Sequence, residues 1–325
     1  MLGSSDEALC RAYDLAMLDL DGVVYVGPEA VPGAPEHLAE AASQGMRLAY
    51  VTNNASRPPE QVAAQLRDLG IEADASDVVT SSQAAARLLV DRLGAGARVV
   101  LLGAAGLEQA LLEADLVPVG AEDDAIAIVT GYGPDVPWGS IMRAAVRIRD
   151  GLPWVASNTD HTFPAPFGVA PGHGVQVEML QRFTGVDPVV AGKPERPLLD
   201  ETVRRVGGKR PLMVGDRLDT DIEGARRAGY DSLLVLTGVT DLAALVAAEP
   251  EQRPTYVAPD LAGLLEAHPE PDADGWRAEV SDGRLTVSGD GSAGDWWRVV
   301  ASAAWAHLDD AGEPVACDGL EPPAR

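Results

Sequence analysis

The chain has 325 residues, of which 46% are hydrophobic and 23% are charged. This balance is typical of a globular protein with two or three domains, and it excludes a globally disordered or fibrous chain. The formal net charge of −25 argues against an extended nucleic-acid surface and against binding to an anionic membrane. The same acidic field repels small anions, so a phosphate site would need cations of its own.

We expect the protein to be cytoplasmic. The two cysteines, Cys10 and Cys317, lie near opposite ends of the chain and do not form a disulfide framework. No basic and apolar leader follows Met1. No apolar run approaches the roughly 18 residues that a membrane span needs.

Apolar strand-like runs alternate with helical patterns along most of the chain. Most of the runs are apolar throughout, as in parallel strands that are covered on both faces. This alternation predicts an α/β fold with doubly wound parallel sheets. The expected strands are, in chain order, Leu15–Leu20, Arg47–Thr52, Arg98–Leu102, Ala125–Thr130, Trp154–Ser157, Val189–Ala191, Leu212–Val214 and Ser232–Leu236. The expected helices include Pro59–Leu69, Gln83–Leu93, Ile141–Arg149 and Glu195–Val206.

The C-terminal segment differs from the rest of the chain. Prolines are dense from residue 250 to residue 271, and His268–Gly275 is predicted to be a linker. Alternating apolar residues flank an Asp282-Gly283 turn, which predicts a hairpin, and apolar residues from Trp297 to Leu308 then recur with helical spacing. We expect a ββα appendage at residues 268–325 that is too small to stand alone, so its apolar face should dock on the rest of the protein.

A G-x-G-x-x-G sequence occurs in this appendage, at residues 289–294. Such a sequence can form the pyrophosphate loop of a dinucleotide-binding fold. Asp290 and Asp295 would repel a pyrophosphate, and only 31 residues follow Gly294, too few for the rest of such a fold. We therefore interpret the sequence as a plain loop.

An acidic pair ends the first apolar run, in the sequence Asp19-Leu20-Asp21-Gly22. Positions i and i+2 of a strand share a face, so both carboxylates can point at one centre. Gly22 lets the chain turn closely round that centre. Ligands bind at the carboxyl ends of strands in open parallel sheets, although an acid pair that caps a helix would give the same short sequence.

Three further apolar runs end in polar residues. Thr52-Asn53-Asn54 follows one run, Gly192-Lys193-Pro194 follows another, and Gly215-Asp216 opens an acidic segment that reaches Asp221. Each of these sequences alone would fit a turn or a solvated loop. Their joint occurrence in this order, each after an apolar run, indicates a common site.

At these residues the sequence resembles the haloacid dehalogenase (HAD) superfamily of phosphohydrolases. The four motifs of that superfamily match Asp19-x-Asp21, Thr52, Lys193 and Gly215-Asp216 with Asp221. The forms of the second and third motifs are similar to those of the NagD-like and p-nitrophenyl phosphatase branch. The resemblance covers roughly residues 12–265 and leaves the C-terminal appendage out.

The resemblance implies a role for each motif residue. Asp19 would be the nucleophile that forms an aspartyl-phosphate. Asp21 would protonate the leaving alkoxide and then activate water as a base. Thr52 and the Asn53–Asn54 loop would hydrogen-bond the phosphoryl oxygens, and Lys193 would neutralise the phosphate as a compact cation.

The resemblance also implies Mg²⁺ as the cofactor, held by Asp19, the backbone carbonyl of Asp21, and Asp216. A site with few protein ligands and several waters suits this ion. Asp221 would orient these ligands, with direct ligation as the alternative. The ion would reverse the local charge, which explains how so acidic a protein accepts a phosphate ester.

The branch implies a Rossmann-like core at residues 1–80 and 189–267, with an α/β cap of the C2 type inserted at residues 81–188 to select the substrate. In the cap, Asn158, Asp160 and His161 could meet the hydroxyls of a small polar leaving group, or could simply form a turn. This polar loop favours glycerol 3-phosphate. Phe163 and Phe167 could instead stack on a pyridoxal ring or a base.

The expected function is the Mg²⁺-dependent hydrolysis of a small phosphorylated metabolite, best matched by glycerol 3-phosphate. Pyridoxal phosphate, phosphoglycolate and nucleoside monophosphates are alternative substrates, and phosphoryl transfer to an alcohol is an alternative reaction. A non-enzymatic scaffold that binds a protein through the appendage agrees less well with the intact motifs. Formation of a homo-oligomer through the cap or the C-terminal appendage stays open.

Overall fold

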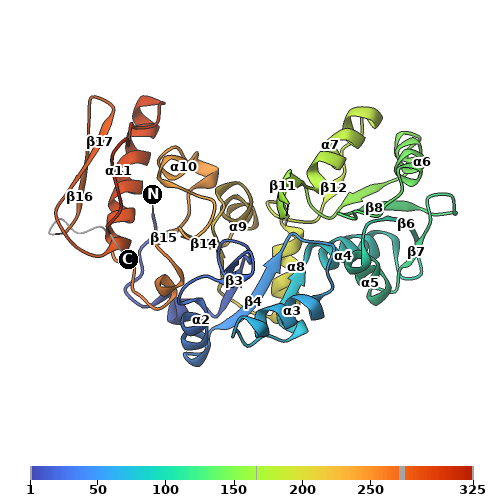
Figure 1. Cartoon of the computed structure of the whole chain (residues 1–325), viewed down its shortest axis with the longest axis horizontal. Coiled ribbons are helices and arrows are strands. Elements are labelled where there is room, and N and C mark those ends of the chain that lie inside the picture. Colours follow the sequence, from blue (N-terminus) through green and yellow to red (C-terminus); the bar gives the residue numbers. More distant parts are fainter. Residues whose placement is uncertain (1, 166, 271–274, 324–325) are drawn as a thin grey trace. The chain divides into compact units, whose positions relative to one another are not determined.

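The computed structural model describes residues 2–165, 167–270 and 275–323 (Figure 1). The chain divides into two compact units, the first made of Met1–Ala49, Leu69–Ile71 and Gly207–Arg325, the second of Tyr50–Asp68 and Glu72–Val206. Each unit holds a parallel sheet with helices, so the predicted α/β class is confirmed. Within the described ranges, no helix has both the length and the apolar character that crossing a bilayer requires.

The first unit is built on parallel strands in the order β15-β14-β13-β1. All four residues of β1 (Leu15–Leu18) are buried, as expected for an apolar strand covered on both faces. The backbone N–H of Arg47 donates to the carbonyl oxygen of Asp14 at 3.1 Å, so β4 (Arg47–Thr52) begins beside β1 and then runs into the second unit. The other strands of this unit are β2 (Tyr25–Val26), β3 (Glu29–Ala30), β13 (Pro211–Gly215), β14 (Asp231–Val235), β15 (Tyr256–Ala258), β16 (Arg277–Ser281) and β17 (Arg284–Ser288). Its helices are α1 (Leu9–Ala12), α2 (Ala34–Ser43), α9 (Glu223–Ala228), α10 (Leu242–Val246) and α11 (Ala293–Ala311), with short helical turns η2 (Leu218–Ile222), η3 (Pro250–Gln252) and η4 (Leu261–Leu264).

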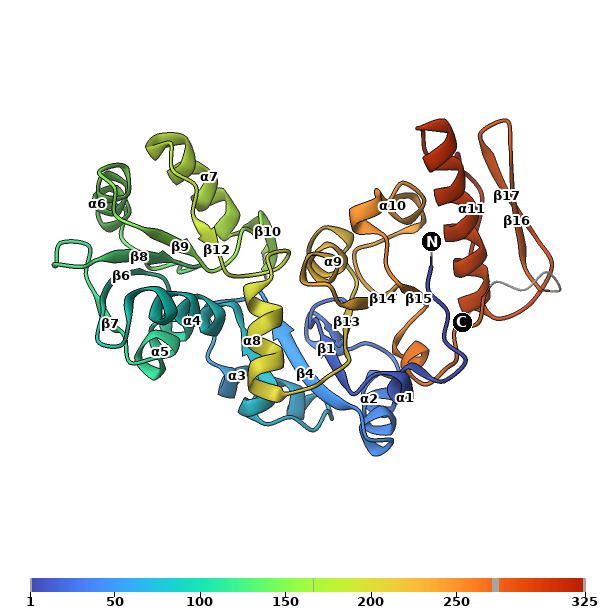
Figure 2. The same cartoon turned by 180° about the vertical axis from the view of Figure 1, so that it is seen from behind.

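The C-terminal ββα appendage has the predicted form. Strands β16 and β17 pair antiparallel across Asp282 and Gly283, whose φ angles of 51° and 70° are those of a tight hairpin turn. Helix α11 lies between this hairpin and α10 (Figures 1 and 2). Trp296, Trp297 and Trp305 are buried in one cluster with residues of α10 and β15, so the expected docking of the apolar face is observed.

The G-x-G-x-x-G segment forms the turn into α11. Ser292 is the N-cap residue, and its side chain accepts a hydrogen bond from the backbone N–H of Asp295 at 3.0 Å. The Asp295 carboxylate also contacts the Ser292 hydroxyl at 2.7 Å and pairs with Arg298. A carboxylate therefore already occupies this helix N-terminus, in line with the plain-loop interpretation.

The predicted linker needs a correction at its start. His268 is buried, and its backbone pairs with that of Ser5 through two hydrogen bonds of 2.7 and 2.8 Å. Its ring Nε2 lies 2.8 Å from the carbonyl oxygen of Gly263. A pairing with the distant N-terminal segment, invisible to local composition, makes this residue part of the fold. Residues 271–274 of the predicted linker lie outside the described residues.

The second unit contains a five-stranded sheet in the order β12-β9-β8-β6-β7, in which each pair of neighbouring strands is parallel. Helices α6 and α7 cover one face of this sheet and α4 and α5 the other (Figure 1). Its strands are β5 (Val78–Thr80), β6 (Arg98–Leu102), β7 (Val117–Val119), β8 (Ala127–Thr130), β9 (Trp154–Ala156), β10 (Thr162–Ala165), β11 (Gly168–Pro171) and β12 (Val189–Val190), and β5 pairs with the end of β4. Its helices are α3 (Pro59–Asp68), α4 (Ser81–Leu93), α5 (Ala105–Glu113), α6 (Trp138–Arg149), α7 (His173–Thr184) and α8 (Pro197–Val206), with a short turn η1 (Ala75–Asp77).

All the predicted strands are present, with ends that differ by at most two residues from the expected ones. The strands that the sequence pattern did not indicate are short, such as β5, β7 and β15. Strand β15 lies in the proline-dense region, where Pro254 and Pro259 flank it without interrupting it. Three residues are too few to show a periodicity, so such strands depend on pairing with a neighbour.

Candidate active site

The first group of predicted site residues lies at the carboxyl ends of β1 and β13. Leu18 pairs with Val214, and the backbone N–H of Asp19 donates to the carbonyl oxygen of Val214 at 2.9 Å. The chain therefore leaves both strands at the same edge of the sheet. Asp19 follows β1 directly, and Asp216 follows β13 directly.

Three carboxylates meet at this edge. Asp19, Asp216 and Asp221 each offer an oxygen, and these oxygens lie within 4.8 Å of one another. Asp216 and Asp221 are buried, at 0% and 1% exposure. Gathering buried carboxylates is unfavourable unless a cation or hydrogen-bond donors compensate. An all-oxygen donor set of this kind fits Mg²⁺.

Asp21 is exposed and lies in a tight turn after β1. The backbone N–H of Gly22 donates to the carbonyl oxygen of Tyr25 at 2.8 Å, and that of Val24 donates to Leu20 at 2.9 Å. The φ angle of Gly22 is 85°, and a Cβ at this position would overlap the Asp216 carboxylate. Only glycine fits both the left-handed conformation and the close approach.

A loop that the sequence analysis did not single out surrounds Asp216. The backbone N–H of Val239 donates to Asp216 Oδ2 at 2.7 Å, and the Thr240 hydroxyl donates to the Asp216 carbonyl oxygen at 2.6 Å. The Thr237 hydroxyl donates to the carbonyl oxygen of Gly22 at 2.5 Å. A Cβ at Gly238 would also overlap the Asp216 carboxylate. The available signal was the position of this loop, directly after the predicted strand Ser232–Leu236, at the edge where ligands bind.

Asp221 closes the turn that follows Asp216. The backbone N–H of Arg217 donates to Asp221 Oδ2 at 3.2 Å. A Cβ at Gly215 would overlap the Asp221 side chain, so this glycine allows the close approach. The side chain thereby connects the segment before Asp216 with the turn after it, which suits a residue that orients a metal ligand.

The second group of predicted residues lies in the second unit, at the end of β4 and after β12. Thr52 and Asn53 are buried, and Asn54 is exposed. The Thr52 hydroxyl oxygen accepts from the backbone N–H of Asn54 at 3.0 Å. Asn54 Oδ1 accepts from the backbone N–H and the hydroxyl of Ser56, at 2.9 and 2.7 Å. Side-chain to backbone bonds of this type fix a turn after the strand.

The Asn53 side chain binds the backbone of Lys193 on both sides. Asn53 Oδ1 accepts from the Lys193 N–H at 2.8 Å, and Asn53 Nδ2 donates to the Lys193 carbonyl oxygen at 3.0 Å. The other Nδ2 hydrogen goes to Asp160 Oδ1 at 3.0 Å. An amide nitrogen carries two hydrogens, so both are used inside this unit. Lys193 itself is only 2% exposed.

The polar loop at residues 158–161 supports this arrangement. Asn158 is buried, and its Nδ2 donates to the carbonyl oxygen of Asn53 at 2.7 Å. His173 Nδ1 lies 2.9 Å from the carbonyl oxygen of Asn158, and burial lowers the pKa of His173 to about 4. His161 is exposed and pairs with Glu178 at 2.9 Å. The Asn158 amide is thus engaged with the backbone rather than presented to a ligand.

Phe163, on the β10–β11 hairpin that follows this loop, pairs with Tyr132, which follows β8. The rings of Tyr132 and Phe163 meet edge to face with centroids 4.8 Å apart. Phe167, at the tip of the same hairpin, is 86% exposed. Exposed aromatic faces can stack on a planar ligand.

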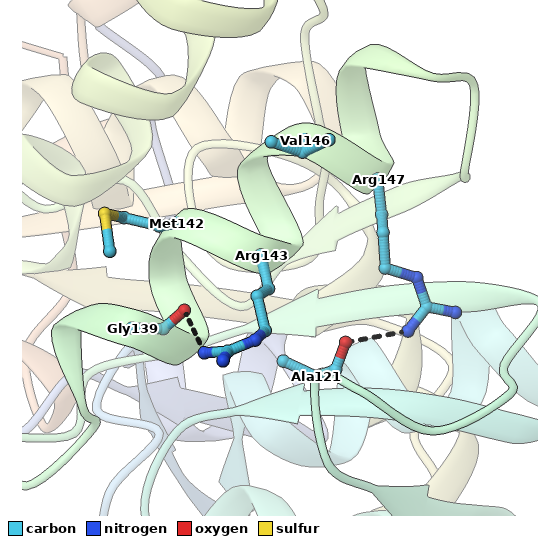
Figure 3. A pocket seen from close by; sticks show the side chains of 6 residues that line it. All are labelled: Ala121, Gly139, Met142, Arg143, Val146 and Arg147. Carbon is cyan, nitrogen blue, oxygen red and sulfur yellow. Dashed lines mark hydrogen bonds between the residues drawn. The ribbon is translucent and has the colours of Figure 1, made fainter.

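A hollow of about 480 Å³ lies beside α6, and none of the residues that line it is a predicted site residue (Figure 3). It is lined by Met142, Val146 and two arginines, among others. The Arg143 guanidinium donates to the Gly139 carbonyl oxygen at 3.2 Å, and that of Arg147 donates to the Ala121 carbonyl oxygen at 3.1 Å (Figure 3). Backbone carbonyls accept from both guanidinium groups, and the Glu122 carboxylate also pairs with Arg143 at 2.8 Å, so this positive charge is already compensated within the protein.

Comparisons with known families agree with these motifs. The family described as haloacid dehalogenase-like hydrolase matches residues 16–117, and a second family, described as HAD-hydrolase-like, matches residues 190–264. The chain belongs to the haloacid dehalogenase-like hydrolases, and within them it is a phosphatase.

Individual relatives show which phosphatases the chain resembles. The chain is 42% identical to D-glycerol 3-phosphate phosphatase of Mycobacterium tuberculosis, over 92% of this chain and 88% of the relative. A crystal structure of glycerol phosphate phosphatase from the same organism, in complex with magnesium, matches with a TM-score of 0.87 and 41% identity over 95% of this chain and 94% of that one. A 4-nitrophenylphosphatase from Thermotoga maritima matches with a TM-score of 0.73 and 29% identity, over 79% of this chain and 98% of that one.

Proposed function

We propose that the protein is a Mg²⁺-dependent phosphomonoester hydrolase whose substrate is glycerol 3-phosphate. The observation that carries the proposal is the cluster of Asp19, Asp216 and Asp221 at the edge of a parallel sheet. The chain that carries this cluster is 42% identical to a phosphatase named for that substrate.

Mg²⁺ would be held by Asp19, the backbone carbonyl of Asp21, and Asp216. The close carboxylate oxygens and their burial support this assignment. When bound, the ion supplies positive charge that offsets the phosphate and polarises a phosphoryl oxygen. Asp221 orients the ligand residues in this proposal, through its hydrogen bond to Arg217.

Asp19 is the proposed nucleophile. Its carboxylate oxygen attacks phosphorus, a P–O bond forms to Asp19, and the ester P–O bond breaks. Asp21 gives a proton to the departing alkoxide, so that glycerol leaves as a neutral alcohol. The Asp21 carboxylate then takes a proton from water, which attacks the aspartyl-phosphate and releases inorganic phosphate. Its exposed position in the turn after β1 suits a group that exchanges protons with solvent.

Phosphate binding is assigned to Thr52, the Asn53–Asn54 loop and Lys193. The Thr52 oxygen accepts from Asn54 N–H, so the Thr52 hydroxyl hydrogen can be donated to a phosphoryl oxygen. The Asn53 contribution would come from its backbone, since its amide hydrogens bind Lys193 and Asp160. Lys193 supplies a local positive charge in a chain with a net charge of −25.

The test is phosphate release from a panel of esters with Mg²⁺: glycerol 3-phosphate, phosphoglycolate, pyridoxal phosphate and a nucleoside monophosphate. We expect the highest kcat/KM for glycerol 3-phosphate. Asp19→Asn should lose activity by at least about 10³-fold, because the amide cannot form the intermediate. Turnover by Asp19→Asn close to that of the wild type would refute the nucleophile assignment, and no release from any ester would refute the proposal.

One observation favours a second substrate class. The Tyr132–Phe163 pair and the exposed Phe167 offer aromatic surface that a pyridoxal ring could use. The same panel decides, because a preference for pyridoxal phosphate that Phe163→Ala abolishes would favour the ring-bearing substrate. Adding glycerol in excess and measuring glycerol phosphate separates hydrolysis from transfer to an alcohol.

We also propose that residues 81–188 form the cap that selects the substrate and that the protein is cytoplasmic. We further propose that the chain self-associates through the cap or the C-terminal appendage. Light scattering coupled to gel filtration would test the oligomeric state, and a monomeric mass at micromolar concentration would contradict self-association.

A further inference from the structure

The loop between β14 and α10 holds Asp216 from three directions. Val239 donates its N–H to Asp216 Oδ2 at 2.7 Å. Thr240 binds the Asp216 carbonyl oxygen through its hydroxyl at 2.6 Å and its N–H at 3.2 Å. Gly238 lies so close to the carboxylate that no side chain fits between them. The position of this carboxylate therefore depends on the position of residues 237–240.

This loop runs directly into α10, and α10 alone cannot hold the loop in position. Helix α10 has five residues, and a helix this short is not stable alone in water. Asp241 caps its first turn by accepting from the Ala244 N–H at 2.8 Å. Leu245 and Val246 are buried, at 0% and 1% exposure. The packing partners of α10 therefore decide where the helix, and the loop before it, are held.

The main partner at the far end of α10 is the C-terminal helix α11. Trp305 is 2% exposed, and its indole Nε1–H donates to the carbonyl oxygen of Leu245 at 2.8 Å. Val300 and Ala304 of α11 are fully buried in the same cluster as Leu245. Figures 1 and 2 show α11 and α10 side by side in both views.

Arg253 also links α10 to α11. Its Nε donates to the carbonyl oxygen of Ala248, just after α10, at 3.0 Å. Its two terminal nitrogens bind both oxygens of Asp309 on α11, each at 2.8 Å. The guanidinium carbon lies 5.5 Å from the ring centroid of Trp305. The Arg253 side chain is only 8% exposed, whereas the Asp309 side chain is 57% exposed. The guanidinium is therefore held by packing on one side and by a bidentate hydrogen-bonded pair on the other.

We propose that the C-terminal appendage supports the metal site. Trp305 of the appendage, and Arg253, which lies outside the appendage and binds its helix α11, act as positioning residues that fix α10 and so hold the Asp216 carboxylate. The inference rests on the proposed function, since Asp216 is a metal ligand there. It gives the appendage a part in catalysis without any contact with substrate. Loosening α11 frees α10, the loop at residues 237–240 loses its fixed position, and Asp216 loses the donor that aims its Oδ2.

The test uses the full chain with Trp305→Phe and Arg253→Met, and Trp296→Phe as the matched control. Trp296 is a buried tryptophan at the other end of α11, so its replacement removes the same ring volume from the same helix. Mg²⁺ binding is measured by calorimetry without substrate, and amide hydrogen exchange is measured across residues 236–241. We expect Trp305→Phe and Arg253→Met to raise the Mg²⁺ dissociation constant by about tenfold, as for other residues that orient metal ligands. Exchange at Val239 should accelerate by about the same factor, and Trp296→Phe should change each quantity less than about twofold.

Arg253→Lys separates positioning from general stability. Lysine keeps the charge but offers a single donor group, so Mg²⁺ affinity should lie between those of the wild type and Arg253→Met. Unchanged exchange at residues 237–240 in both Trp305→Phe and Arg253→Met overturns the inference, as does an equal effect of Trp296→Phe. The exchange measurement needs no metal, so it remains decisive even if the wild type fails to bind Mg²⁺, a result that would count against the proposed function instead.

Discussion

The Asn53 amide offers the sharpest test of how the second unit holds Lys193. Asn53→Leu keeps the approximate volume of the side chain and removes its three hydrogen bonds, to the Lys193 N–H and carbonyl oxygen and to Asp160 Oδ1. Each net bond is worth about 0.5–1.5 kcal/mol, and buried partners left without one cost more. We expect the free energy of local opening at Lys193 to fall by about 2–4 kcal/mol.

Hydrogen exchange at the Lys193 amide measures this change directly. A loss of about 2–4 kcal/mol corresponds to exchange that is about 30- to 1,000-fold faster. The kcat/KM for the preferred ester should fall by about 10²-fold, because the ammonium group loses its fixed position. Gln61→Leu, an amide-to-leucine change on the exposed surface of α3, is the control and should alter stability by less than about 0.5 kcal/mol. Exchange at Lys193 in Asn53→Leu within about threefold of the wild type would refute this reasoning.

Three further outcomes are expected. Burial lowers the pKa of His173 from 6.5 to about 4, so the unfolded chain takes up a proton below pH 6.5 that the folded chain does not accept until about pH 4. The free energy of unfolding should therefore fall by about 3 kcal/mol as the pH drops through that window. In urea titrations, His173→Gln should reduce this dependence of the unfolding free energy on pH. An unaltered pH dependence in the variant would contradict the assignment. Gly22→Ala places a Cβ against the Asp216 carboxylate at a φ of 85°, so calorimetry should show at least about tenfold weaker Mg²⁺ binding, whereas wild-type affinity would count against the site. Ser292→Ala removes the N-cap of α11 and should lower stability by about 1 kcal/mol, seen as a lower melting temperature; no change would mean that the cap contributes nothing.

Local patterns were sufficient to predict most of the framework. Continuous apolar runs such as Arg47–Thr52 and Arg98–Leu102 match observed strands residue for residue. The Asp282-Gly283 turn and the helical spacing from Trp297 to Leu308 predicted the ββα appendage. These features depend on the preferences of neighbouring residues, which the sequence displays directly.

The sequence also predicted that Asp19 and Asp216 lie close together. Asp19 and Asp216 follow apolar runs, and the carboxyl ends of parallel strands meet at one edge. The observed 4.8 Å cluster with Asp221 agrees with that expectation. The resemblance of the four motifs further indicated the hydrolase family, which the comparisons confirm.

The sequence by itself therefore determined the order of strands and helices, the family, and the residues that end each strand. Only the tertiary structure decided that the Asn53 amide binds the Lys193 backbone across 140 positions of the chain, and that Trp305 reaches Leu245 across 60. It also decided that His268 pairs with Ser5 rather than belonging to a linker. The physical reason is that a polar side chain takes whichever donor or acceptor the packed chain brings within about 3 Å, and no local pattern records which distant segment that will be.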